Sequence, residues 1–167
     1  MNPHLVFAGR PNDPLVDVFI DGIQAGGVRV TRVLEDVHTL IDAVTPESIV
    51  GGFSRGARLS VSVAEQVPVA GLILLGYPFH PKGEPSDLVM RDRLCALRVS
   101  TLVLQGERDV HGNRQRIGDI GGCVTMAWLR DGNHRFIPRQ SSGLESGELL
   151  ADAVATALAF IRRLSPS

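Results

Sequence analysis

The sequence predicts an α/β fold: a three-layer, doubly wound and mainly parallel six-stranded sheet with helices on both faces. Three observations favour it. Short apolar runs alternate with helical patterns along the 167 residues. Most of these runs are continuous Val, Ile and Leu, as expected for strands that are buried on both faces. One run leads through a Gly-x-Ser-x-Gly motif straight into a helical pattern.

The six predicted strands are short and rich in branched apolar residues, which favour an extended backbone. Turn residues or helical patterns separate each strand from the next. In chain order the predicted strands are His4–Ala8, Val28–Thr31, Ser48–Gly51, Ala70–Leu75, Thr101–Gln105 and Val124–Trp128.

Helical patterns fill the intervals between these strands. The first opens at Asp13, just before a proline, which is typical of a helix N-cap. The second carries Leu34, Leu40 and Val44 on one face, and the last has the longest apolar stripe. The predicted helices are Asp13–Ala25, Leu34–Val44, Arg55–Gln66, Asp87–Leu97, Arg114–Ile120 and Ser146–Leu164.

Length and composition indicate one globular domain that spans residues 1–167. The chain is 44% hydrophobic and 21% charged, which is ordinary for a protein with a packed core. Its formal net charge of −1 and its scattered arginines offer no basic patch for nucleic acid or for a membrane surface. We therefore expect neither of these as a partner.

Neither a cofactor nor a metal is expected from the motifs. The chain has no Gly-x-Gly-x-x-Gly or Walker sequence, and its two cysteines, Cys95 and Cys123, lack metal-ligand spacing. Two buried thiols in a reducing compartment are the preferred interpretation. The first residues carry no signal-peptide pattern, and the longest apolar run, Val67 to Leu75, is too short to span a bilayer. We expect a soluble, cytoplasmic protein.

The most informative motif runs from Gly52 to Gly56, with Ser54 at its centre. A strand, turn and helix of this kind are typical of a nucleophile elbow, in which a strained turn lifts the serine hydroxyl above the end of the sheet. The residues two positions away on either side must be small, because the strand and helix backbones nearly touch there. The alternative is that Ser54 merely caps the following helix.

A serine hydroxyl needs a neighbouring base to take its proton, and that base needs a third group to orient it. Asp109 follows the fifth predicted strand and His134 follows the sixth, so both are expected at the carboxyl edge of the sheet. The order nucleophile, acid, base matches one hydrolase architecture. Glu107 is an alternative acid. The alternative for His134 is an ordinary loop histidine, which is also the preferred interpretation of His111.

Four segments between Ser48 and Phe136 carry a more specific signal than the elbow alone. They are Gly52-Phe53-Ser54-Arg55-Gly56-Ala57-Arg58, Leu74-Leu75-Gly76-Tyr77-Pro78-Phe79-His80-Pro81, Leu104-Gln105-Gly106-Glu107-Arg108-Asp109 and Gly132-Asn133-His134-Arg135-Phe136. Together they resemble the α/β-hydrolases, specifically the small lidless serine hydrolases related to dienelactone hydrolase. Within that group the chain is similar to the family that includes testis-expressed protein 30 and the third subunit of the NSL chromatin complex.

The resemblance implies a minimal version of this fold that lacks the first two strands of its relatives. It also implies a serine hydrolase of small ester, thioester or lactone substrates that works through an acyl-enzyme. Ser54 would attack the carbonyl and His134 would take its proton, while Asp109 orients His134. The alternative is a non-catalytic binding or scaffold domain that keeps the fold.

The loop after the first strand differs from that of the relatives, which commonly carry His-Gly followed by small residues. This chain has Ala8-Gly9-Arg10-Pro11 there. Pro11 has no N–H to give. The expected oxyanion donors are the backbone N–H of Arg55, which is the residue after the nucleophile, and that of Arg10. Without a long insertion that could form a lid, an open substrate pocket is expected. Its predicted lining residues are Gly9, Phe53, Tyr77 and His80.

The absent outer strands leave a predicted sheet edge at Val28–Thr31. An uncovered edge strand presents unpaired backbone groups that can pair with another chain. We therefore expect a covering loop or a homodimer at this edge, and a small acyl compound as the other partner.

Overall fold

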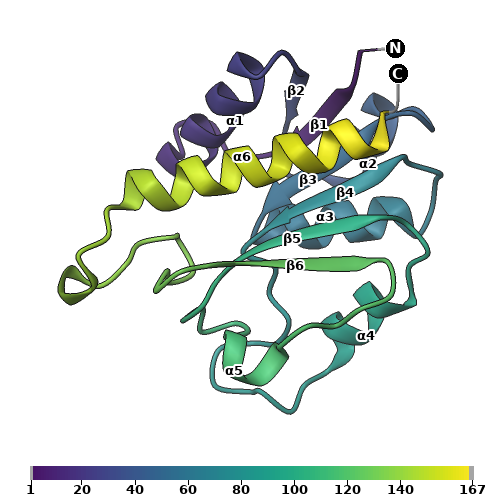
Figure 1. Ribbon diagram of the computed structural model, residues 1–167. Helices are drawn as coiled ribbons and strands as arrows, with labels where there is room; N and C mark the ends of the chain where they lie inside the picture. The colour runs from purple at the N-terminus through teal and green to yellow at the C-terminus, as the bar shows by residue number, and fades with distance from the viewer. Residues whose placement is uncertain (1, 166–167) are drawn as a thin grey trace.

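The computed structural model describes residues 2–165, which fold around one six-stranded sheet (Figure 1). The strands are β1 His4–Ala8, β2 Arg29–Val33, β3 Ile49–Phe53, β4 Gly71–Leu75, β5 Thr101–Gly106 and β6 Val124–Leu129. They are ordered β2-β1-β3-β4-β5-β6, and every neighbouring pair is parallel. The predicted fold class is thereby confirmed.

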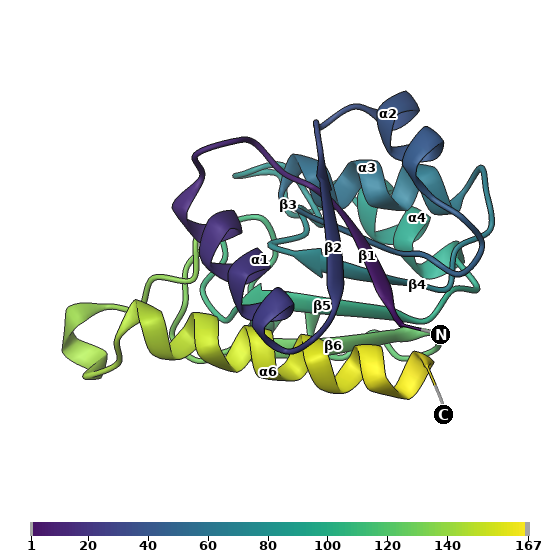
Figure 2. The ribbon, with the colours of Figure 1, turned by 90° about the horizontal axis from the view of Figure 1, so that it is seen from above.

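Helices cover both faces of this sheet. They are α1 Pro14–Ala25, α2 Val37–Ala43, α3 Arg55–Ala64, α4 Val89–Ala96, α5 Arg114–Ile117 and α6 Ser146–Leu164, and a short 3₁₀ turn, η1 Gln140–Ser142, precedes the last. Figure 2 shows α1 and α6 side by side on one face and α2, α3 and α4 on the other. The three predicted layers are therefore present.

The two faces have separate apolar cores, because side chains alternate across each strand. Leu5 and Phe7 of β1 belong to the core beneath α1 and α6, whereas Val6 and Ala8 belong to the core beneath α2 and α3. The predicted cap of α1 is present, since the carboxylate of Asp13 accepts hydrogen bonds from the first backbone N–H groups of that helix.

The second strand and the helix after it lie later in the chain than predicted. β2 runs to Val33 because that residue pairs with Ala8 at the end of β1. The helix begins only after Asp36, whose side chain accepts the N–H of Thr39 at 2.8 Å and so caps it. Leu34, predicted on the apolar face of this helix, is instead 65% exposed in the connection.

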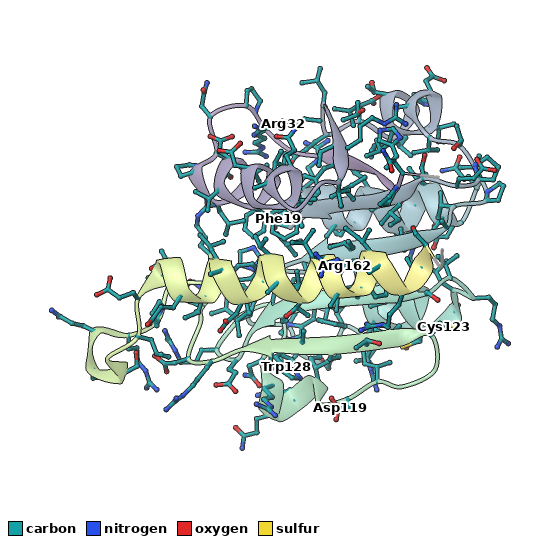
Figure 3. All side chains as sticks on the ribbon, turned by 45° about the horizontal axis from the view of Figure 1, so that its top comes forward. Phe19, Arg32, Asp119, Cys123, Trp128 and Arg162 are labelled. Atoms are coloured by element: carbon teal, nitrogen blue, oxygen red, sulfur yellow. The ribbon has the colours of Figure 1, made fainter. Side chains whose placement is uncertain are left out.

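The prediction of buried cysteines is wrong, since Cys95 and Cys123 are both exposed. α4 buries only Leu94, so the next position along this short helix faces solvent. Cys123, labelled in Figure 3, follows an exposed turn of two glycines before β6. Neither position is covered by another element.

β2 forms one edge of the sheet and β6 forms the other. Arg29 and Thr31 of β2 are exposed, and the predicted homodimer through this edge stays a prediction. Among residues 2–165, no helix combines the length and the apolar character needed to cross a bilayer.

Candidate active site

Ser54 lies between β3 and α3, at the carboxyl edge of the sheet. Its backbone has φ 53° and ψ −105°, a conformation that non-glycine residues rarely adopt. The side chain makes no capping hydrogen bond to α3, which speaks against the alternative role as a helix cap. The turn is held in place by the backbone N–H of Ser54, which donates to the carbonyl of Leu75 at 2.9 Å.

Two glycines allow this turn. A Cβ at Gly52 would lie 2.3 Å from the carbonyl carbon of Gly56, and a Cβ at Gly56 would lie 2.5 Å from the carbonyl oxygen of Ala8. Both contacts are with backbone atoms, which cannot turn aside as a flexible side chain can. The elbow is therefore packed tightly against the end of β1, where the loop to α1 begins.

The structure brings the three residues Ser54, Asp109 and His134 together in one hydrogen-bonded chain. His134 Nε2 lies 3.0 Å from Ser54 Oγ, and His134 Nδ1 lies 2.8 Å from Asp109 Oδ2. A carboxylate only accepts hydrogen bonds, so Nδ1 carries the proton and the lone pair of Nε2 faces the serine hydroxyl. In this tautomer an imidazole can take the hydroxyl proton.

Asp109 is fully buried, and its carboxylate accepts three hydrogen bonds. Oδ1 accepts the backbone N–H of His111 at 2.8 Å. Oδ2 accepts the side-chain amide of Gln105 at 3.1 Å in addition to the imidazole of His134. The alternative acid, Glu107, forms an ion pair with an arginine of α5 instead.

Charged groups fix the loop that carries His134. Glu107 accepts the backbone N–H of Asp131 at 3.0 Å, and Arg108 donates to the carbonyl of Asp131 at 2.8 Å. The carboxylate of Asp131 in turn accepts Nε and Nη2 of Arg139 at 2.9 and 2.5 Å. These contacts tie the loop after β6 to the loop after β5, and so hold the imidazole against its carboxylate partner.

This charged cluster predicts a loss of stability in acid. Hydrogen bonds from Arg139 lower the pKa of Asp131, and the N–H of Asp131 lowers the pKa of Glu107. A carboxyl group whose pKa is lower in the folded state than in the unfolded state stabilises the fold at pH values above its unfolded pKa. This contribution is lost as the pH falls toward and through its folded pKa. We expect the free energy of unfolding to decrease as the pH drops through the ordinary values of 4.5 and 3.8.

Urea denaturation at a series of pH values measures this loss. In Asp131→Asn the decrease between about pH 5 and pH 3 should be smaller than in the wild type, because one of the titrating groups is gone. An unchanged pH profile in this variant would contradict the stabilising role of the cluster.

Two cavities meet at Ser54. One is charged, with a volume of about 260 Å³, and is lined by Arg10, Asp13, Glu35, Phe53, Ser54, Arg55, His134 and Arg135. The other is more apolar, with a volume of about 450 Å³, and is lined by Ser54, Arg58, Pro78, His80, Pro81, Asp87, Val89, Met90 and His111. Over residues 2–165, no three His, Cys, Asp or Glu side chains cluster in a way that could hold a metal ion.

Of the four predicted pocket residues, Phe53 lines the charged cavity and His80 lines the apolar cavity. The structure brings neither Gly9 nor Tyr77 to them. Tyr77 is fully buried and donates its hydroxyl to the carbonyl of Met90, and burial raises the pKa of this phenol. Gly9 packs against α1, where a Cβ would come within 2.7 Å of a side chain.

Sequence reasoning assigns no role to two residues that lie beside the hydrogen-bonded chain. The ring of His111 stands edge-on to that of His134, with the centroids 4.8 Å apart. The guanidinium of Arg135 lies over the ring of Phe53 at 5.1 Å and pairs with Asp13 at 2.7 Å. Their only signal in the sequence is proximity to Asp109 and His134, which is too weak to assign a contact.

The two predicted oxyanion donors have free backbone N–H groups. Neither Arg55, the first residue of α3, nor Arg10, in the loop after β1, donates to a backbone acceptor within residues 2–165. Arg32, labelled in Figure 3, holds this loop from the end of β2. It donates from Nε to the carbonyl of Gly9 at 3.4 Å and from Nη2 to the carbonyl of Arg10, and it pairs with Asp17 at 2.5 Å.

A parallel sheet of this strand order, with a serine elbow followed along the chain by an aspartate and a histidine, is the architecture of the α/β-hydrolases. The chain belongs to this family, because the family model described as an alpha/beta hydrolase domain matches residues 22–162. A search of curated protein sequences finds no match.

Solved structures with the same fold include several hydrolases. The esterase domain of a Rhodothermus marinus protein has a TM-score of 0.70 at 16% identity, over 99% of this chain and 90% of that one. A serine hydrolase without a lid from Xanthomonas campestris has a TM-score of 0.65 at 17% identity, over 96% and 80%. A serine hydrolase homologue from Coxiella burnetii has a TM-score of 0.64 at 16% identity, over 93% and 84%. These identities show the fold alone, and the finer resemblance to dienelactone hydrolase stays a prediction.

Proposed function

We propose that this protein is a serine hydrolase that cleaves small esters, thioesters or lactones through an acyl-enzyme. Ser54 attacks the substrate carbonyl, and His134 takes its proton and returns it to the leaving group. The backbone N–H groups of Arg55 and Arg10 stabilise the oxyanion. The observation that carries the proposal is the hydrogen-bonded chain from Ser54 through His134 to the buried Asp109, on a serine with strained backbone.

The two cavities indicate how an ester would lie across Ser54. The leaving group must receive its proton from His134, so it belongs in the charged cavity, which His134 lines. The acyl group then belongs in the apolar cavity, beside Val89 and Met90. This cavity is open and about 450 Å³ in volume, which is within the usual range for a site that binds a small molecule.

Arg32 supports the assignment of the second oxyanion donor. In a trans peptide the C=O of one residue and the N–H of the next point in opposite directions, and no cis peptide occurs among residues 2–165. Because Arg32 holds the carbonyl of Gly9, the N–H of Arg10 points away from β2 and stays free. The guanidinium of Arg32 therefore orients the peptide that carries the second proposed donor.

Arg32→Ala is expected to lower kcat about 10-fold to 100-fold with little change in KM, because a loosened donor stabilises the transition state less well. The matched control is Asp17→Asn, which removes the ion pair with Arg32 but leaves both carbonyl contacts. Steady-state kinetics with p-nitrophenyl acetate measure both variants. An equal loss in Asp17→Asn would show that the ion pair matters and the carbonyl contacts do not.

A fluorophosphonate probe tests the proposal, because it reacts with a serine that a neighbouring base has activated. We expect the wild-type chain to be labelled and Ser54→Ala to remain unlabelled, as read by intact mass spectrometry. Ser62→Ala is the matched control, since Ser62 lies on α3 but lines neither cavity, and its labelling should equal that of the wild type. Folded wild-type protein that takes no label would refute the proposal and favour the non-catalytic domain.

A further inference from the structure

A third cavity, of about 220 Å³, lies between the loop after β4, the start of α4 and α5. Phe79 and Ile117 form part of its apolar lining, and His80, Arg91 and Arg116 provide its polar groups. No Asp or Glu from the described part of the chain lines it. The cavity is therefore small, partly enclosed and positively charged.

Two nitrogen atoms of its lining residues are buried without a partner. His80 is only 6% exposed, and its Nδ1 donates to the carbonyl of Pro81 at 2.8 Å, since a carbonyl can only accept. Its Nε2 has no hydrogen-bond partner within residues 2–165, and the same is true of Nε of Arg91. Folded proteins leave few buried polar atoms unpaired, so two of them around one cavity point to a ligand.

The neighbouring arginines on the same two helices make a useful contrast. Arg93 of α4 pairs with Glu65, and Arg114 of α5 pairs with Glu107. Among the ion pairs of residues 2–165, none involves Arg91 or Arg116. Of the arginines on these two helices, the two that line the cavity are thus the ones that form no ion pair within residues 2–165.

We propose that this cavity binds a phosphate group. Guanidinium groups bind phosphate oxygens with strong, charge-assisted hydrogen bonds, and α4 and α5 each supply one guanidinium group to this cavity. Phosphate also carries a hydroxyl at neutral pH, which can donate to the free lone pair of His80 Nε2. Sulfate has no such hydroxyl and is the weaker ligand.

The proposed site is connected to the hydrogen-bonded chain but does not depend on the proposed reaction. His80 also lines the apolar cavity, and its carbonyl accepts Nδ1 of His111 at 3.2 Å. The backbone N–H of His111 donates to Asp109. Binding can be measured without any turnover, so its failure would leave the hydrolase proposal untouched.

Isothermal titration of the full chain with inorganic phosphate, at constant ionic strength in chloride buffer, tests the site. We expect saturable binding of one phosphate ion per chain, with a lower Kd than that of sulfate. Arg91→Gln and Arg116→Gln should each weaken phosphate binding about tenfold or more, because each removes a charged donor. The matched controls Arg93→Gln and Arg114→Gln make the same charge change on the same helices. Their Kd for phosphate should stay within about twofold of that of the wild type.

A further variant separates this cavity from the charged cavity beside Ser54. Arg55→Gln should bind phosphate like the wild type, and the imidazole NMR signal of His80 should shift on titration. The proposal is overturned if the wild type shows no saturable binding up to about 10 mM phosphate. It is equally overturned if the controls lose as much affinity as Arg91→Gln, or if only Arg55→Gln loses it.

Discussion

Asp109→Asn is expected to slow ester hydrolysis by about four orders of magnitude while leaving the protein folded, because it changes the tautomer of His134. The backbone N–H of His111 cannot turn and requires an acceptor at the Oδ1 position, whereas the side-chain amide of Gln105 can turn its oxygen toward the Oδ2 position. The amide NH₂ of asparagine therefore takes the place of Oδ2. There it donates to Nδ1 of His134. The imidazole must then carry its proton on Nε2, where it faces Ser54 and can no longer take the hydroxyl proton.

Glu107→Gln is the matched control, since it changes the other carboxylate of the same loop. Glu107 contacts Arg114 and the backbone of Asp131, so kcat/KM should stay within about tenfold of the wild type. Hydrolysis of p-nitrophenyl esters, with circular dichroism to check the fold, compares the two variants. A greater loss in Glu107→Gln than in Asp109→Asn would mean that the wrong acid has been assigned.

Gly52→Ala is expected to destabilise the fold by roughly 3 kcal/mol or more, because the added methyl group has no space. Its Cβ would lie within 2.3 to 2.7 Å of three backbone atoms of Gly56. Relief of this clash requires α3 to move away from β3, which would also disturb the contact of Gly56 with Ala8. Urea denaturation measures the loss, and a chain that no longer folds is the extreme form of the same result.

Gly147→Ala is a control for which the expected change in the free energy of unfolding has the opposite sign. Apart from its chain neighbours and its own helical turn, no heavy atom of residues 2–165 lies within 4 Å of a Cβ at Gly147, which is exposed in the first turn of α6. The substitution should therefore add about 0.5 kcal/mol to the free energy of unfolding, because alanine loses less backbone entropy than glycine in a helix. A Gly52→Ala variant as stable as Gly147→Ala would contradict the close approach of β3 and α3.

The sheet could be predicted because each buried strand is a continuous apolar run, and α6 because its apolar stripe is long and polar residues precede it. Local patterns mislead where a tertiary contact decides the boundary. Leu34 has helical spacing with Leu40, but the pairing of Val33 with Ala8 extends the strand and moves the helix start to a later cap. The exposure of Cys95 likewise depends on how little of α4 is buried, which its residue type does not indicate.

The sequence was enough to predict that Ser54, Asp109 and His134 lie at one edge of the sheet, because the carboxyl ends of parallel strands meet there. Their catalytic role stays a prediction. The lining of the cavities could be predicted only in part, for Phe53 and His80, because segments far apart in the chain form them. Arg135 meets Asp13 across 122 positions, and the burial of Tyr77 depends on its contact with α4.

The order of the strands has a consequence for how the molecule assembles. β1 pairs with both β2 and β3, so the first half of the chain can form one side of the sheet, from the edge strand β2 to Ser54 at the end of β3, on its own contacts. Asp109 follows β5 and His134 follows β6, so both come later in the chain than Ser54. A chain that is still being synthesised would therefore carry Ser54 without its proposed base until β6 has docked.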